Sequence, residues 1–270
     1  MRKLVRLGLV SGVTFFLFVK CDPCKKLAKS KSIAEKDSAA YCYFNNKNFE
    51  SAALIFEELI GLYRGTARVE KVTYFYALAK YNTGDYITAA FYFNEYIQQF
   101  PVSTYSEEAS YMIAQCYYMQ SNTYELDQAE TLKAIEYFKL FLQLYPKSER
   151  ANQANNQIKE LQRKLAQKLY NQANVYLKIY EYQAATIAFK NLIKDYPDSP
   201  FREEATFKLF KAALLYALNS IEEKKEQRLV EAISYFLKFE STFPQSKFLN
   251  EARVLYSQAQ QQLKKLKKTN

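Results

Sequence analysis

Two cysteines near the N-terminus are the first residues whose type and spacing could do chemistry. Cys21 and Cys24 form a CxxC pair, the spacing of redox dithiols and of half a zinc site. The 270-residue chain has no histidine and no second CxxC, and the pair lies outside any β-α-β pattern, so a metal or redox centre is not indicated. The chain also lacks a Gly-x-Ser-x-Gly motif and a glycine-rich phosphate loop. The sequence therefore does not indicate an enzyme, and we expect no cofactor.

The segment before Cys21 suggests a different chemistry for that cysteine. A basic start, MRKLVR, precedes an apolar run over residues 7 to 19, which is too short to span a bilayer as a helix and is typical of a signal peptide. The stretch FVKC at 18 to 21 resembles the lipobox of bacterial lipoproteins, in which the cysteine becomes the acylated N-terminus. We expect a covalent lipid on Cys21, with a simple cleaved signal or an uncleaved anchor as the alternatives.

The net charge of the chain is moderate. There are 38 basic and 28 acidic residues, and removal of residues 1 to 20, which hold four of the basic ones, leaves 34 against 28, or +6. This excess is spread over the chain and does not predict nucleic-acid binding. The one concentrated patch is LKKLKK at 263 to 268. Cations suit a helix C-terminus, and contact with anionic lipid or an acidic protein is the alternative that makes Lys264 and Lys265 candidate partner contacts.

A ten-residue phrase recurs and sets the architecture. FPVSTYSEEA at 100 to 109 returns with the same frame at 145, 196 and 243, at spacings of 45, 51 and 47 residues, the period of helical repeat arrays. Proline ends one helix, and the serine two positions later can accept hydrogen bonds from the exposed N–H groups of the next helix. The sequence thus predicts helix corners at these prolines. The predicted N-cap residues are Ser103, Ser148, Ser199 and Ser246.

A second pattern precedes each proline. A small residue is followed four positions later by an aromatic and eight after that by the proline, which looks like the second helix of a tetratricopeptide (TPR) repeat. The members are Ala89, Phe93 and Pro101; Ala134, Phe138 and Pro146; Ala185, Phe189 and Pro197; and Ala232, Phe236 and Pro244. A weaker copy at 45 to 72 brings the number of helix pairs to five. Cys42 and Cys116 lie at helix-core spacing and are expected to be buried small hydrophobic residues. The predicted fold is all-α, a TPR-type α-solenoid of five helix-turn-helix repeats.

Two repeats are stretched, and one helix is long. Residues 121 to 133 and 219 to 229 are insertions between paired helices, which in solenoids map to loops that often meet partners; a solvated linker or an exposed helical end is the alternative for the second. Asp127 and Gln128 of the first insertion are candidate partner contacts. Residues 150 to 178 carry one apolar stripe and should form one long helix, or two nearly continuous ones.

We therefore expect four segments in the chain. They are a signal peptide at 1 to 20, a lipidated linker at 21 to 34, an N-terminal TPR half with three repeats at 35 to 155, and a C-terminal half with two repeats and the basic tail at 156 to 270.

The 24 tyrosines have two interpretations. At TPR positions a tyrosine usually packs between helices, but some could line a groove and offer a ring and a hydroxyl to a partner. Tyr81 and Tyr118, which follow Ala77 and Ala114 on presumed first helices, are the candidates for this second role.

Together these features resemble the BamD family of lipoproteins, most closely in its Bacteroidota form. The resemblance rests on the lipobox-like cysteine, five TPRs with proline-x-serine corners, LDQ at 126 to 128 and KDYPDSPFREEA at 194 to 205. It implies a lipoprotein on the periplasmic face of the outer membrane, whose back repeats bind a BamA-type barrel protein and whose front repeats receive the targeting signals of unfolded outer-membrane β-barrel proteins. Relatives carry a Tyr-Tyr pair where this chain has Val175 and Tyr176, so only Tyr176 is carried over, and Ala188 stands where relatives have an arginine.

One other function fits the same features. A TPR lipoprotein could instead scaffold division or peptidoglycan proteins of the cell envelope. Co-purification of either a barrel protein or cell-wall synthases would separate the two.

Overall fold

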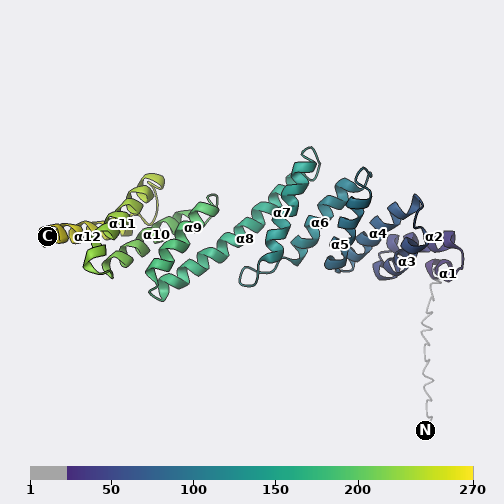
Figure 1. Cartoon of the computed structure of the whole chain (residues 1–270), viewed down its shortest axis with the longest axis horizontal. Coiled ribbons are helices and arrows are strands. Elements are labelled where there is room, and N and C mark those ends of the chain that lie inside the picture. The colour runs from purple at the N-terminus through teal and green to yellow at the C-terminus, as the bar shows by residue number, and fades with distance from the viewer. Residues whose placement is uncertain (1–22, 270) are drawn as a thin grey trace, which may run out of the picture. The chain divides into compact units, whose positions relative to one another are not determined.

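The computed structural model describes residues 23 to 269, and within them the chain is built from helices, with no strand (Figure 1). Cys21 and the predicted signal peptide lie outside the described residues. The helices are α1 (Pro23–Ala28), α2 (Ile33–Asn45), α3 (Phe49–Leu62), α4 (Arg68–Asn82), α5 (Tyr86–Gln99), α6 (Ser106–Gln120), α7 (Ala129–Leu144), α8 (Ala151–Lys178), α9 (Tyr182–Asp195), α10 (Arg202–Leu218), α11 (Glu222–Thr242) and α12 (Leu249–Thr269).

The chain divides into two compact units, Met1–Thr83 and Gly84–Asn270. The described part of the first unit contains α1 to α4, and the second contains α5 to α12. Within each unit every helix packs against the next one along the chain, and in the second unit α12 also contacts α10. In chain order the helices from α2 to α11 form five consecutive pairs, each with a first and a second helix. The last helix, α12, follows them as the first helix of a sixth pair would. This is the predicted all-α, TPR-type arrangement.

The unit boundary differs from the expected division between halves. The expected division at 155/156 lies inside α8, whereas the compact units separate in the short link after α4. The division into functional halves stays a prediction. Among residues 23 to 269, no helix combines the length and apolar character needed to cross a bilayer.

The four proline corners confirm the predicted helix ends. Pro101, Pro146, Pro197 and Pro244 directly follow the last residues of α5, α7, α9 and α11 and their aromatic C-caps. These aromatic residues have φ near −130° and ψ near 60°, outside the helical region, as expected for a residue before proline. The acidic residues of the phrase lie in the first turn of the next helix, for example Glu107 and Glu203, where the helix dipole favours negative charge.

The serines of these corners were predicted as N-caps, and that prediction is wrong by two residues. Each serine oxygen accepts a hydrogen bond from the backbone N–H of the residue just before the helix, over 3.1 or 3.2 Å. The reason is that the aromatic residue, the proline and the serine close a turn of their own, in which the serine N–H donates to the aromatic carbonyl. The four acceptor and donor pairs are Ser103 and Tyr105, Ser148 and Arg150, Ser199 and Phe201, and Ser246 and Phe248.

The repeated small and aromatic residues form the core. Ala185 and Phe189 of α9 are fully buried and pack with alanines of α8 and α10. Phe236 of α11 belongs to a second cluster, formed with α10 and α12. Alanine at the contact lets neighbouring helices approach closely, and the aromatic ring fills the space beside it. The alanine that closes each corner phrase is also fully buried: Ala109, Ala154, Ala205 and Ala252.

The two insertions adopt different structures. The first forms a loop between α6 and α7, as predicted. Most of the second continues α11 at its N-terminal end, so α11 is 21 residues long, and the helical alternative for this segment is confirmed. An ion pair between Glu222 and Lys225, 2.6 Å apart and three residues apart in sequence, supports this extension. The predicted long helix is a single helix, α8, of 28 residues.

The cysteines differ from the prediction at one position. Cys116 is fully buried and free, as expected, and burial raises the pKa of its thiol to about 12. Cys42 is not a simple buried hydrophobic residue, because it forms a disulfide with Cys24 across a Cα separation of 5.6 Å. This bond joins α1 to α2 within the first unit.

Candidate partner-binding surface

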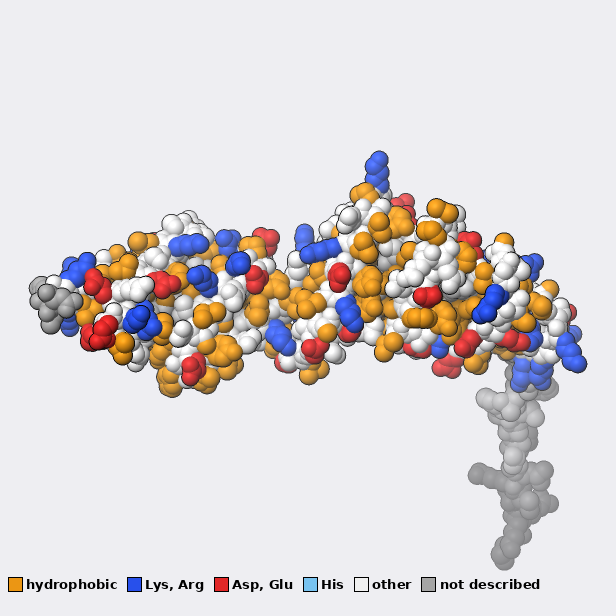
Figure 2. Space-filling view, viewed as in Figure 1, with side chains coloured by type: hydrophobic (Ala, Val, Ile, Leu, Met, Phe, Trp, Pro, Cys, Tyr) orange, Lys and Arg blue, Asp and Glu red, His pale blue; other side chains and the backbone are white. Residues whose placement is uncertain are grey.

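The first helices of successive repeats in the second unit are joined by polar side chains. On the face of this unit shown in Figure 2, basic and acidic side chains are interspersed with hydrophobic ones and form no single field of one sign. Between α6 and α8, the hydroxyl of Tyr111 donates to Gln157 over 2.9 Å, and Gln157 in turn donates to Gln115 over 2.7 Å. About one helical turn after Gln115 and Gln157, the hydroxyl of Tyr118 donates to Glu160 over 2.8 Å. Desolvation, together with this bond to a carboxylate, raises the pKa of Tyr118 to about 12.

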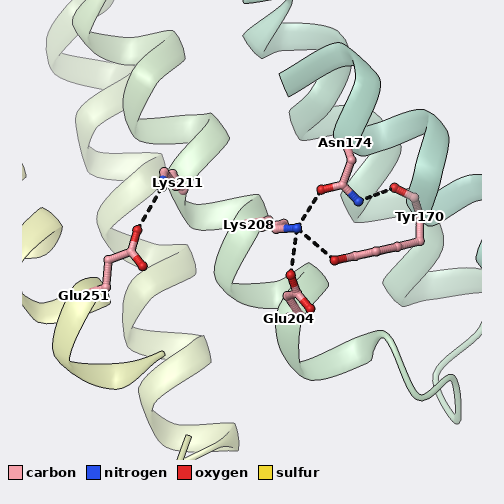
Figure 3. Close-up of polar contacts among 6 residues, drawn as sticks. All are labelled: Tyr170, Asn174, Glu204, Lys208, Lys211 and Glu251. Atoms are coloured by element: carbon pink, nitrogen blue, oxygen red, sulfur yellow. Dashed lines mark hydrogen bonds and ion pairs between the residues drawn. The ribbon is translucent and has the colours of Figure 1, made fainter. Parts of the chain in front are cut away.

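The same series continues from α8 to α10 and α12 (Figure 3). Lys208 of α10 donates to the Tyr170 hydroxyl over 2.8 Å and to Asn174 over 2.6 Å, and pairs with Glu204 at 2.7 Å. Burial alone would lower the pKa of Lys208, but its bonds to Glu204 and Tyr170 outweigh burial and raise it. Lys211 then pairs with Glu251 of α12 at 2.8 Å. Since charged hydrogen bonds fix geometry, these contacts set the register of α8, α10 and α12.

A bidentate ion pair joins the first turn of α6 to the residue just before α8. Arg150 donates through Nε and a terminal nitrogen to the two carboxylate oxygens of Glu108, over 2.6 and 2.7 Å. The guanidinium also lies 4.6 Å from the centre of the Tyr111 ring. Both charged side chains are partly shielded from solvent. Since a bidentate pair also fixes the geometry of its two groups, it holds the Pro146 corner against α6.

The loop at 121 to 128 is held in place by buried hydrogen bonds. Gln128 is 7% exposed; its amide nitrogen donates to the carbonyls of Thr123, Leu126 and Asp127, and its oxygen accepts from Thr131. The Asp127 carboxylate accepts the backbone N–H of Ala129 over 2.8 Å and so caps the start of α7.

Two lysines of α8 attach this loop to the neighbouring helix. Lys164 donates to the Ser121 hydroxyl over 2.7 Å, and Lys168 donates to the carbonyl of Leu126. Desolvation lowers the pKa of Lys164. The loop therefore has a fixed conformation, in which the side chain of Leu126 is 56% exposed.

An exposed apolar patch lies at the C-terminal end of α8. Val175, Ile179 and Tyr180 are 53%, 55% and 77% exposed, and the half-buried Tyr176 is adjacent to Val175 in the last turn of the helix. The Tyr176 ring packs on the core of α8, α9 and α10, and its hydroxyl accepts a hydrogen bond from Gln172 over 3.2 Å. We call these four residues the α8 end patch.

Tyr180 has an unusual backbone. Its φ is +66°, in the left-handed region that bulky residues rarely adopt. The N–H of Glu181 donates to the carbonyl of Tyr176 over 2.9 Å, which is the hydrogen bond of a Schellman helix end. The turn between α4 and α5 has Gly84 with a φ of +84°. A highly exposed aromatic residue thus occupies a conformation that glycine adopts at no steric cost.

The predicted partner contacts are distributed as follows. Asp127 and Gln128 lie in the loop at 121 to 128, where Gln128 is buried and acts within the loop, and Tyr118 lies near the end of α6, just before the loop. Tyr176 lies further along α8, in the end patch. Tyr81 is half-buried in the first unit, and Lys264 and Lys265 are exposed on α12. Their roles in partner binding stay predictions.

The sequence analysis missed three exposed residues. Ile179 and Tyr180 carry no motif, and Leu126 belongs to the LDQ stretch but was not itself proposed as a contact, because hydropathy alone does not distinguish an exposed apolar residue from a buried one. In the corresponding helix-pair turns, Gly84 follows α4 and Lys47, with a φ of 59°, follows α2, so the residue type in the turn does not by itself single out Tyr180. In the part of the chain that the structure describes, no group of three or more cysteine, aspartate or glutamate side chains is arranged to hold a metal.

Comparison with known proteins assigns this helical array to a family. The family model of YfiO, described as an outer membrane lipoprotein, matches residues 38 to 229, which is more than half of the chain. The chain belongs to this family. A curated relative, the outer membrane protein assembly factor BamD of Caulobacter vibrioides, is 31% identical over 152 residues, or 56% of this chain. The chain spans about half of that relative, 49% of its length. The YfiO family is non-enzymatic.

Solved TPR structures align more distantly. The TPR2AB domain of yeast Sti1, in a complex with pHSP90, aligns at 17% identity and a TM-score of 0.39, covering 84% of this chain and 98% of that one. The TPR domain of P58(IPK) aligns at 13% identity and a TM-score of 0.41, covering 89% and 68%. At these scores the alignments carry no argument about this chain.

Proposed function

We propose that this protein is an outer-membrane protein assembly factor, the lipoprotein subunit of a β-barrel assembly (BAM) complex. The observation that supports this most strongly is the match to the outer membrane lipoprotein family over residues 38 to 229, joined by 31% identity to a curated assembly factor. In this proposal the chain is attached through a lipid on Cys21 to the periplasmic face of the outer membrane.

The protein acts by holding other proteins. The back repeats, α8 to α11, bind a BamA-type barrel protein, and the front repeats receive the targeting signals of unfolded β-barrel proteins. Rigidity of the second unit supports such a role, because the polar contacts from α6 to α12 fix its binding surfaces before a partner arrives, which reduces the entropy lost on binding.

Two surfaces of the second unit are the proposed protein contacts. The α8 end patch offers two tyrosines, a residue type enriched in binding hot spots, beside exposed apolar side chains. The loop at 121 to 128 presents Leu126 from a fixed backbone. Both surfaces include or adjoin the partner residues expected from the sequence: Tyr118, Asp127, Gln128 and Tyr176.

Affinity purification tests the function. The tagged protein, solubilised from membranes in mild detergent, should recover a BamA-type barrel protein, and its depletion should lower the amount of outer-membrane porins. Recovery of division or cell-wall synthases without a barrel protein would instead identify an envelope scaffold and overturn the proposal.

Site-specific crosslinking tests the two surfaces. A photo-crosslinking residue at position 179 should form an adduct with the BamA-type barrel protein in intact cells, and one at position 126 should form an adduct with an unfolded β-barrel substrate. The same residue at Lys139, an exposed position on α7 outside both surfaces, is the matched control. Adducts from position 139 but from neither of the other two would refute the assignment of these surfaces.

The lipid anchor has its own test. Mass spectrometry of the mature N-terminus should find an acylated residue 21, and Cys21→Ala should release the protein into the soluble periplasmic fraction. Continued membrane retention of that variant would overturn the anchor assignment.

A further inference from the structure

The disulfide makes α1 part of the folded first unit. Cys24 is fully buried, its sulfur is bonded to Cys42 of α2, and the side-chain amide of Asn46 donates to that sulfur over 3.3 Å. The segment expected to be a linker, 21 to 34, therefore contains a helix packed on α2. The folded body begins within three residues of Cys21.

Four lysines are exposed on α1 and the turn that follows it. Among the described residues no ion pair involves them, whereas the next lysine along the chain, Lys36, pairs with Glu58. Two of the four border an open depression of about 600 Å³, and Glu35 is the one carboxylate among its lining residues. Figure 2 shows basic side chains gathered over α1, where the described chain begins. The members of this α1 lysine patch are Lys25, Lys26, Lys29 and Lys31.

We propose that the α1 lysine patch binds anionic phospholipid headgroups of the membrane to which the chain is attached. The proposal rests on the proposed lipid at Cys21. Three residues of chain span at most about 11 Å, close to the Debye length of about 8 Å at physiological salt. The lipid anchor thus places α1 within electrostatic range of headgroup phosphates.

Proximity favours a membrane over an acidic protein as the partner. The anchor would hold these lysines beside a lipid surface at all times, whereas a protein partner would have to be recruited there. The disulfide matters because it fixes α1 to the first unit. Headgroup contacts would therefore orient that unit at the membrane in addition to tethering it.

The expected strength follows from the charge. Each basic residue near an anionic surface adds to the attraction, so neutralisation of four lysines should weaken vesicle binding by at least about tenfold. The attraction should also weaken as salt concentration rises.

Vesicle cosedimentation tests this with the full mature chain carrying Cys21→Ser, which removes any lipid. The chain should bind phosphatidylcholine vesicles that contain phosphatidylglycerol and should bind pure phosphatidylcholine vesicles at least about tenfold more weakly. Neutralisation of the α1 lysine patch should remove this difference. The variant is Lys25→Gln, Lys26→Gln, Lys29→Gln and Lys31→Gln.

A matched control neutralises four exposed lysines of the second unit that lie outside every candidate contact and should retain binding to within about threefold. The proposal is overturned if the α1 variant binds like the unmodified chain, if the control variant loses as much binding as the α1 variant, or if the chain does not prefer anionic vesicles. Since the probe has no lipid, any of these results leaves the Cys21 assignment to be decided separately by mass spectrometry. The control is Lys139→Gln, Lys190→Gln, Lys194→Gln and Lys238→Gln.

Discussion

Replacing Tyr180 with glycine should stabilise the second unit while removing its most exposed aromatic ring. The residue has a φ of +66° and is 77% exposed. A left-handed conformation costs a residue with a β-carbon about 1 to 2 kcal/mol, and this cost disappears in glycine.

Two smaller terms oppose the gain. Glycine loses about 0.5 to 1 kcal/mol more backbone entropy on folding, and the edge contact between the Tyr180 and Tyr182 rings, 6.2 Å apart, is lost. The net gain should be about 0.5 kcal/mol, which for a unit of this size raises Tm by about 1 to 2 °C.

Tyr180→Ala is the matched control, because it removes the same ring and keeps the β-carbon. In urea unfolding followed by circular dichroism, the glycine variant should be about 1 kcal/mol more stable than the alanine variant. Equal stabilities, or a more stable alanine variant, would refute the assignment of backbone strain. If the Tyr180 ring contacts a partner, both variants should recover less barrel protein in affinity purification. Only the glycine variant should be more stable than the unmodified chain.

Three further results are expected. Reduction of the Cys24–Cys42 disulfide, whose cysteines are 18 residues apart, should lower the unfolding free energy of the first unit by about 3 kcal/mol, and urea unfolding that is insensitive to reductant would contradict this. Native Cys116 should resist iodoacetamide at neutral pH and react only after denaturation, because burial raises its pKa to about 12; alkylation of the native protein would disprove its burial. Burial would raise the pKa of Glu204, but its bonds to Lys208 and Tyr170 outweigh burial and lower it, so its stabilising effect is complete above the unfolded value of 4.5 and is lost as pH falls through the folded value. The loss of Tm on acidification should therefore be smaller in Glu204→Gln, and an unchanged acid profile would show that the pair contributes nothing.

The corners and the core could be predicted from the sequence because each follows from a local steric rule. Proline must end a helix, as it does at Pro101, and a small residue four positions before an aromatic, as at Ala89 and Phe93, marks a close helix contact. The length of α8 also followed from its single apolar stripe.

The errors arose where a structure depends on contacts that spacing does not encode. Ser103 was placed at the helix start because proline and serine were assumed to adjoin the helix, whereas they form a separate turn before it. Cys42 was assigned to the core because nothing in the sequence shows that α1 folds back on α2 and brings Cys24 to it.

For the candidate site, the sequence could place residues in an element but could not show what surrounds each side chain. Asp127 and Gln128 do lie in a distinct loop, but Gln128 is buried beneath it, since only the folded loop brings three carbonyl oxygens around its amide. Tyr118 was expected to offer a hydroxyl to a partner, and that hydroxyl donates to Glu160 of α8.

The continuity of α8 has a consequence for how the second unit tolerates change. Its N-terminal part holds α6 through Gln157 and Glu160, and its C-terminal part holds α10 through Tyr170 and Asn174. A helix turns about 100° and advances 1.5 Å per residue. Deleting one residue between these two sets would therefore rotate and shift everything after it relative to everything before it. The residues that contact α6 and those that contact α10 could then no longer both meet their partners, so the length of this segment of α8 is constrained from both sides.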